Sequence, residues 1–236
     1  MNKARGISLV ILLTNGLISS GQELKYPLPM KPDPIRLASE ITAFQEADIL
    51  NQPPMGGVVC TGSSSMRMWH PRIKKDLLGI TIVPRGFGGS HYTDVIYYVK
   101  ELVLKYRPRA LLIYEGDNDA AYGKSPERIF SDFKYLILRC RKDLPELRFY
   151  IVGSKPSISR WHIAEDMQTA NSLIESYCRE DSYCTYIDVW PSILGTDEKP
   201  RRELFMKDKL HLNSAGYDQW ANAIAPIIFK GEASIE

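Results

Sequence analysis

Short apolar segments alternate with longer amphipathic segments along most of this chain of 236 residues. Strand–helix alternation with apolar strands requires a parallel sheet whose two faces are both covered by helices. We therefore predict an α/β fold built on a five-stranded parallel sheet. The predicted strands occupy residues 58–61, 80–83, 110–115, 149–153 and 185–189. The predicted helices lie near residues 34–50, 66–77, 91–106, 126–143, 163–180 and 214–229.

Capping residues mark several of the predicted helix starts. Asp33 and Ser125 each precede a proline, so a capping side chain is followed by proline at the first helical position. Asn213 is predicted to cap the last helix. Pro226 is predicted to kink or shorten that helix, because proline cannot donate the hydrogen bond that a helix interior needs.

The N-terminus has the pattern of a secretory signal peptide over residues 1–21. Lys3 and Arg5 precede a short apolar run, and small residues offer a cleavage site before Gln22. The run is far shorter than the roughly 20 residues that span a bilayer. We therefore expect a secreted or periplasmic protein with no stable membrane insertion after cleavage. Residues 22–33 form a proline-rich, extended lead-in to a single domain over 34–236.

The composition excludes several classes of protein. Hydrophobic residues make up 44% of the chain and charged residues 25%, as in ordinary globular proteins. A formal net charge of +2 leaves no basic footprint for nucleic acid. Four cysteines are too few for a disulfide scaffold, although Cys178 and Cys184 could pair in an oxidising compartment. We expect no metal and no cofactor, because His70, His91 and His162 show no metal-ligand spacing.

A serine-rich turn follows the first predicted strand, and a histidine precedes the last predicted helix. The turn contains Ser63, Ser64 and Ser65. A serine at a strand-to-helix turn is well placed as a nucleophile, because a helix N-terminus favours an oxyanion. Spacing alone does not choose among the three serines, and such a run also fits an ordinary loop. Asp208 and His211 stand three positions apart, so the acid could orient the base.

Two further polar segments follow the second and third predicted strands. Segment 85–90 is glycine-rich and contains Gly89, so its backbone could cradle a phosphate or donate to an oxyanion. It lacks the Lys-Ser/Thr pair of a P-loop. The amide of Asn118 could donate to an oxyanion or close an Asx turn. Because ligands bind beyond the carboxyl ends of parallel strands, we expect all these segments to meet at one edge of the sheet.

In chain order, these segments resemble the four sequence blocks of the SGNH/GDSL hydrolase family, in its bacterial GDSL-type esterase/lipase branch. The family's serine, glycine, asparagine and histidine fall on Ser64, Gly89, Asn118 and His211, and its aspartate falls on Asp208. The resemblance covers nearly all of the chain that follows the lead-in.

The chain also departs from the family pattern. Ser63 stands in place of the acid in the Gly-Asp-Ser-Leu sequence, and Pro84 stands where an asparagine often precedes the glycine block. Neither change removes a catalytic group, but both weaken the assignment of a substrate. Within segment 155–161, Lys155-Pro156-Ser157 together with Arg160-Trp161 resembles one branch of bacterial GDSL-type proteins.

The resemblance implies a flavodoxin-like three-layer α/β/α sandwich and a serine esterase that hydrolyses short-chain carboxylic esters. His211 would take a proton from Ser64, and Asp208 would orient His211 in a catalytic triad. The oxyanion hole would consist of the Ser64 and Gly89 N–H groups and the Asn118 amide. Small-molecule or carbohydrate esters, such as O-acetyl sugars, are the expected substrates.

Two residues are candidates for substrate binding. Arg67 lies one helical turn after the serines and could bind an acidic substrate group or form a structural ion pair. Trp161 could be a platform for a sugar or acyl group, or it could pack against the core. A non-catalytic ligand-binding module on the same fold is the alternative function. A nucleotide-binding function is excluded by the missing phosphate motif.

Overall fold

The computed structural model describes residues 29–232 and residue 235. The predicted signal peptide, residues 1–21, lies outside the described residues, as does the first part of the predicted lead-in. Within the described part of the chain, no helix is both long enough and apolar enough to cross a membrane.

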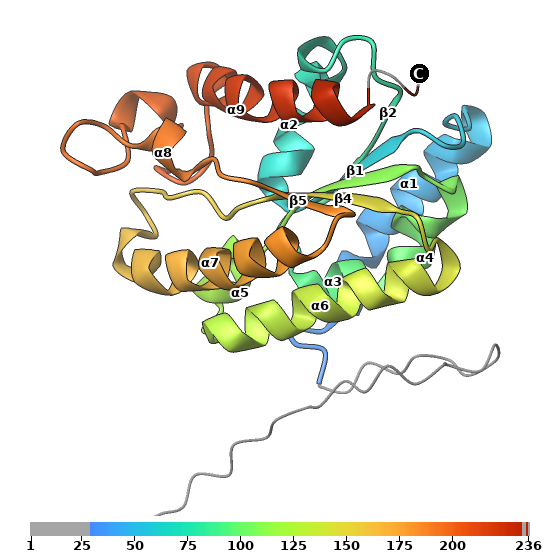
Figure 1. The fold of residues 1–236 in the computed structure, drawn as a ribbon, viewed down its shortest axis with the longest axis horizontal. Coiled ribbons are helices and arrows are strands. Elements are labelled where there is room, and N and C mark those ends of the chain that lie inside the picture. The colour runs from blue at the N-terminus through green and yellow to red at the C-terminus, as the bar shows by residue number, and fades with distance from the viewer. Residues whose placement is uncertain (1–28, 233–234, 236) are drawn as a thin grey trace, which may run out of the picture.

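A five-stranded parallel sheet forms the centre of the molecule, as predicted (Figure 1). Its strand order is β2-β1-β3-β4-β5, which is the order of flavodoxin-like folds. The strands are β1 (Val58–Gly62), β2 (Ile82–Gly86), β3 (Ala110–Tyr114), β4 (Arg148–Val152) and β5 (Cys184–Ile187). The register pairs Gly62 with Gly86 on one side and with Tyr114 on the other, so the three strands end level.

Helices cover both faces of the sheet, which confirms the three-layer architecture (Figure 1). The α-helices are α1 (Ala38–Leu50), α2 (Ser64–Asp76), α3 (Tyr92–Tyr97), α4 (Val99–Leu102), α5 (Asp117–Ala121), α6 (Pro126–Asp143), α7 (Ala164–Glu180), α8 (Trp190–Ile193) and α9 (Ser214–Glu232). The short 3₁₀ helices are η1 (Pro34–Leu37), η2 (Leu104–Tyr106), η3 (Trp161–Ile163) and η4 (Arg202–Leu204).

Alternate residues of each strand enter different cores, as the pleat of a strand requires. Leu111 and Ile113 of β3 pack in the core formed with α3, α6 and α7. Ala110, Leu112 and Tyr114 pack in the core formed with α2 and α9. Because both faces are covered, β3 is buried along its whole length, and this explains its continuous apolar sequence.

The second strand begins and ends later than predicted. We expected it over residues 80–83, whereas β2 covers Ile82–Gly86 and includes Pro84 and Arg85. Proline lacks the N–H that a central strand needs. β2 is an edge strand with only β1 beside it, and an edge strand tolerates proline.

Two helix predictions are also corrected. The helix expected near 91–106 is divided into α3, α4 and η2, because the backbone at Tyr98 leaves the helical conformation, with ψ at +18°. No glycine or proline marks that break in the sequence. α9 continues past Pro226 to Glu232, whose carboxylate accepts hydrogen bonds from Arg148 and from the Tyr150 hydroxyl. The cap at Asn213 is confirmed, since its side chain accepts the Gly216 N–H at 3.1 Å.

Candidate functional site

The turn between β1 and α2 places a serine at the first position of α2. This turn needs glycine at position 62. Gly62 has a φ of +127°, and a Cβ there would lie 2.1 Å from the Tyr114 carbonyl oxygen. The Ser63 N–H donates to the same carbonyl at 3.0 Å. The backbone at Gly62 and Ser63 therefore lies close to the end of β3, and α2 begins at the next residue. Ser64 is the first residue of α2, where backbone N–H groups have no acceptor within the helix.

Of the three adjacent serines, Ser64 is the one that contacts the histidine. Its Oγ lies 2.9 Å from the Nε2 of His211, and the residue is partly exposed. The Ser63 side chain is fully buried, and its Oγ has no hydrogen-bond partner among the described residues. Ser65 is also buried, and its carbonyl accepts a hydrogen bond from the Tyr217 hydroxyl. The structure therefore presents Ser64, and not its neighbours, to a base and to solvent.

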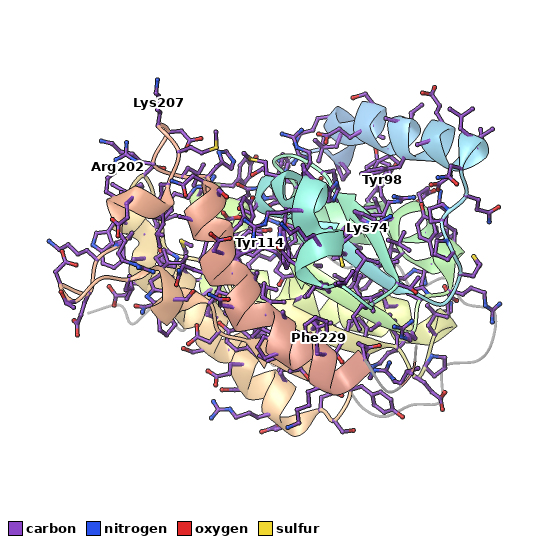
Figure 2. The ribbon with its side chains drawn as sticks, turned by 90° about the horizontal axis from the view of Figure 1, so that it is seen from above. Lys74, Tyr98, Tyr114, Arg202, Lys207 and Phe229 are labelled. Atoms are coloured by element: carbon purple, nitrogen blue, oxygen red, sulfur yellow. The ribbon has the colours of Figure 1, made fainter. Side chains whose placement is uncertain are left out.

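Asp208 holds the other side of the His211 ring. Its Oδ2 lies 2.6 Å from the ring Nδ1, and its Oδ1 accepts the backbone N–H groups of Leu210 and His211 at 2.9 and 3.0 Å. Although burial alone would raise it, the hydrogen bonds from His211 and the backbone lower the pKa of Asp208 to about 2. The carboxylate therefore stays charged beside the imidazole over the ordinary pH range. Asp208 lies in a segment that extends outward from the body of the molecule at the neighbouring residue Lys207. Figure 2 shows this segment at the periphery, away from the central residue Tyr114, which lies beside α9.

The glycine loop after β2 presents an unused backbone donor. Gly89 is exposed and has a φ of +71°. Its carbonyl accepts a hydrogen bond from Arg36 at 3.1 Å, and Arg36 also binds Asp94 with two hydrogen bonds. Glu40 accepts the Gly88 N–H at 3.0 Å. No acceptor among the described residues takes the Gly89 N–H, so that group is available to a ligand.

Asn118 occupies the first turn of α5, beyond the end of β3. Its Nδ2 donates to the Ser90 carbonyl at 2.9 Å, so it bridges from β3 to the glycine loop. Residues 117–121 form a short helix, preceded by Gly116 with a φ of +106°. Asp117 and Asp119 are ion-paired, with Arg160 at 2.9 Å and Lys124 at 2.6 Å. Neither aspartate is placed as a second catalytic acid.

The two predicted substrate-binding residues have different environments. The Arg67 side chain is 50% exposed and lies 3.4 Å from Glu40, and its guanidinium covers Gly88. It therefore borders the glycine loop and remains open to solvent. Trp161 packs against the core, with its ring centroid 6.3 Å from that of Trp190.

Several residues around the site were not assigned roles from the sequence. Arg36 and Glu40 brace the glycine loop, but they lie about 50 positions before it and carry no spacing signature. Glu115 is a buried acid that contacts the Ser90 hydroxyl. Burial, followed by the charge of Asp119, raises the pKa of Glu115 well above its ordinary value. Its position directly after an apolar strand was the available sign that it would be buried.

The remaining histidines and cysteines have structural surroundings. His70 accepts the Gly86 N–H at 2.9 Å, and burial lowers its pKa to about 4, aided by the charges of Arg85 and Arg67. All four cysteines are buried free thiols. A hydrogen bond with Cys178, followed by burial, raises the pKa of the Cys184 thiol. Cys178 and Cys184, which could have paired, are therefore separate thiols in this structure.

Comparison with known proteins places this arrangement in a family. Residues 52–219 match the model of the GDSL-like Lipase/Acylhydrolase family. No curated protein matches the chain in sequence.

Several solved structures share the fold. A GDSL-like lipase from Bacteroides thetaiotaomicron VPI-5482 is 18% identical, with a TM-score of 0.68 over 84% of this chain and 98% of that chain. A carbohydrate esterase of family 3 from Talaromyces cellulolyticus is 15% identical, with a TM-score of 0.62 over 77% of this chain and 100% of that chain. A serine-to-alanine variant of an acetyl esterase, solved with an acetate ion, is also 15% identical, with a TM-score of 0.62 over 77% of this chain and 100% of that chain.

Proposed function

The chain belongs to the GDSL-like lipase/acylhydrolase family, and we propose that it is a serine esterase that hydrolyses short-chain carboxylic esters through an acyl-enzyme on Ser64. One observation carries the proposal. The Ser64 Oγ, both nitrogens of the His211 ring and the Asp208 carboxylate form a continuous hydrogen-bonded chain. This is the arrangement of nucleophile, base and orienting acid that acyl transfer needs.

The reaction begins when the Ser64 oxygen attacks the ester carbonyl carbon and His211 accepts the serine proton. Asp208 holds the imidazole in the tautomer that leaves Nε2 free to accept, and it stabilises the imidazolium that forms. The tetrahedral intermediate collapses, the bond to the alcohol oxygen breaks, and His211 returns the proton to the leaving alkoxide. Water then attacks the acyl-enzyme with His211 as the base, which releases the acid and restores Ser64.

Three donors would stabilise the negative oxygen of the intermediate. They are the Ser64 N–H at the start of α2, the Gly89 N–H, which has no acceptor among the described residues, and the second amide hydrogen of Asn118. Donors fixed before the reaction stabilise developing charge without reorganisation, and each is worth about 3 kcal/mol of the barrier.

Short acyl groups fit the comparisons and the site surroundings. The structural neighbours named an acetyl esterase and a carbohydrate esterase favour acetyl esters of carbohydrates as substrates. Arg67 is half-exposed beside the glycine loop, where it would contact a polar or acidic part of the alcohol. Trp161 remains a candidate platform for a sugar ring. The signal-like N-terminus supports export to the periplasm or the exterior.

The function is tested by ester hydrolysis with purified protein covering residues 22–236. p-Nitrophenyl esters of increasing acyl length and acetylated sugars are assayed beside Ser64→Ala. We expect hydrolysis that is fastest for acetyl or another short acyl group and that falls by about four orders of magnitude or more in Ser64→Ala. Ligand binding without turnover of any ester would overturn the proposal in favour of a binding module.

A further inference from the structure

Arg160 lies in the loop between β4 and η3, and its guanidinium contacts the Asn118 side chain. One terminal nitrogen donates to the Oδ1 of Asn118 at 2.8 Å, and the other donates to the Oδ2 of Asp117 at 2.9 Å. The Arg160 side chain is 16% exposed, and that of Asp117 is 6% exposed. We propose that Arg160 is a positioning residue that fixes the Asn118 amide in the one orientation that can donate to an oxyanion. This inference rests on the proposed function.

The neighbours of the Asn118 amide determine which way it faces. A guanidinium has only donors, so it can bond to the amide oxygen and not to the NH₂ group. A carbonyl is only an acceptor, so the Ser90 carbonyl requires the NH₂ group. The reversed amide would place two donors together at Arg160 and two acceptors together at Ser90. Both contacts therefore exclude the reversed orientation.

The fixed orientation leaves one donor for a ligand. Nδ2 carries two hydrogens, and the Ser90 carbonyl takes one of them. The second remains for the oxyanion. The hydrogen bond from the charged guanidinium to Oδ1 also polarises the amide, because hydrogen bonds in a chain strengthen one another. Without Arg160, the Ser90 carbonyl would be the one remaining contact that orients the amide, and the polarising charge at Oδ1 would be lost.

The loop that carries Arg160 is also attached to the histidine segment. The Lys155 side chain is buried, and its Nζ donates to the Leu210 carbonyl at 2.8 Å. The Ser159 N–H donates to the Lys209 carbonyl at 3.1 Å. These contacts immediately precede His211. One loop therefore holds both the Asn118 amide and the segment of the catalytic base, which fixes one relative to the other.

A double-mutant cycle separates positioning from a general structural role. We expect Arg160→Met to lower kcat by about 10- to 100-fold with KM changed less than about twofold, since only a transition-state contact is weakened. In an Asn118→Ala background, the same substitution should lower kcat by less than about threefold, because the group it positions is already gone. An equal loss in both backgrounds would overturn the proposal.

Two controls isolate the contact. Arg141→Met breaks a similar two-pronged pair with Asp181, at 2.5 and 2.8 Å, away from the site, and it should leave kcat unchanged. Arg160→Lys keeps the charge but loses the planar fork, and it should also lower kcat with little change in KM. If Arg160→Met does not fold, Arg160→Lys replaces it in the double-mutant cycle.

A second readout requires no substrate. The side-chain NH₂ resonances of Asn118, identified by their absence in Asn118→Ala, are compared between wild type and the Arg160 variant. We expect both resonances to move when the guanidinium is removed, and unchanged resonances would overturn the proposal. An inactive wild-type protein would overturn the proposed esterase function, while this spectrum would still decide whether Arg160 holds the amide.

Discussion

The Nε2 atom of His211 lies 2.9 Å from the Oγ atom of Ser64, although 147 positions of the chain separate the two residues. The parallel sheet brings them together. Ser64 begins the helix that follows β1, and His211 lies in the segment before α9, which packs on the same face of the sheet as α2. The predictions below follow from this contact and from the groups that support it.

Replacing Asp208 by asparagine should disable the base while the fold is kept. The Asp208 Oδ1 accepts two backbone N–H groups, so the oxygen of an asparagine would stay on that side. Its NH₂ group would then face Nδ1 and favour the imidazole tautomer with its proton on Nε2. We expect kcat to fall by about 10⁴-fold. Equal kcat values for the variant and the wild type would contradict the assigned role.

Asn118→Asp should be more damaging than Asn118→Ala. Both variants lose the amide donor, which costs about 100- to 1,000-fold in kcat. The aspartate would remain paired with Arg160 and would add negative charge where the oxyanion forms. We expect a lower kcat for Asn118→Asp than for Asn118→Ala on the same ester. The reverse order would show that the carboxylate does not face the reacting oxygen.

Gly89→Ala should strain the glycine loop without a clash. Within the part of the chain that the structure describes, a Cβ at Gly89 would have no atom within 4 Å, but the backbone has a φ of +71°. A left-handed conformation costs an alanine about 1–2 kcal/mol. We expect a small loss in the free energy of unfolding by urea and a larger relative loss in kcat as the loop relaxes. Gly123→Ala, at a φ of +89° and also in open space, is the matched control and should lose stability alone.

Glu115→Gln should change how stability depends on pH. Burial, followed by the charge of Asp119, raises the pKa of Glu115 well above its ordinary 4.5. The folded protein therefore holds a proton that the unfolded chain releases above that pH, so the free energy of unfolding falls as pH rises toward the folded pKa. Glutamine keeps the shape and removes this loss. We expect the variant to gain thermal stability relative to wild type at about pH 8 and less at about pH 5. An equal difference at both pH values would refute this account.

The strand–helix alternation predicted the fold class because a parallel sheet buried on both faces needs continuous apolar strands. The errors arose where tertiary contacts override local pattern. Pro84 is tolerated because β2 is an edge strand, and α9 continues past Pro226 to Glu232, which is hydrogen-bonded to Arg148 of β4. The local sequence shows neither the edge position of β2 nor the contact between Glu232 and β4.

The polar segments after the strands predicted two contacts that the structure contains, Ser64 with His211 and Asn118 with the glycine loop, because the carboxyl ends of parallel strands lie together. Spacing alone did not choose among the three serines, whereas burial of Ser63 and Ser65 distinguishes them in the structure. The supporting contacts from Arg36, Glu40 and Arg160 were not predicted. They join segments that are distant in the chain and depend on side-chain directions.

The most direct test of the central claim is the site of covalent labelling by a serine-reactive phosphonate. Intact wild-type protein, Ser64→Ala and, as matched controls, Ser63→Ala and Ser65→Ala are treated in parallel and examined by mass spectrometry. The account predicts one adduct on wild type and on both controls, mapped to Ser64, and none on Ser64→Ala. An adduct that persists in Ser64→Ala, or a wild-type protein that takes no label, would contradict it.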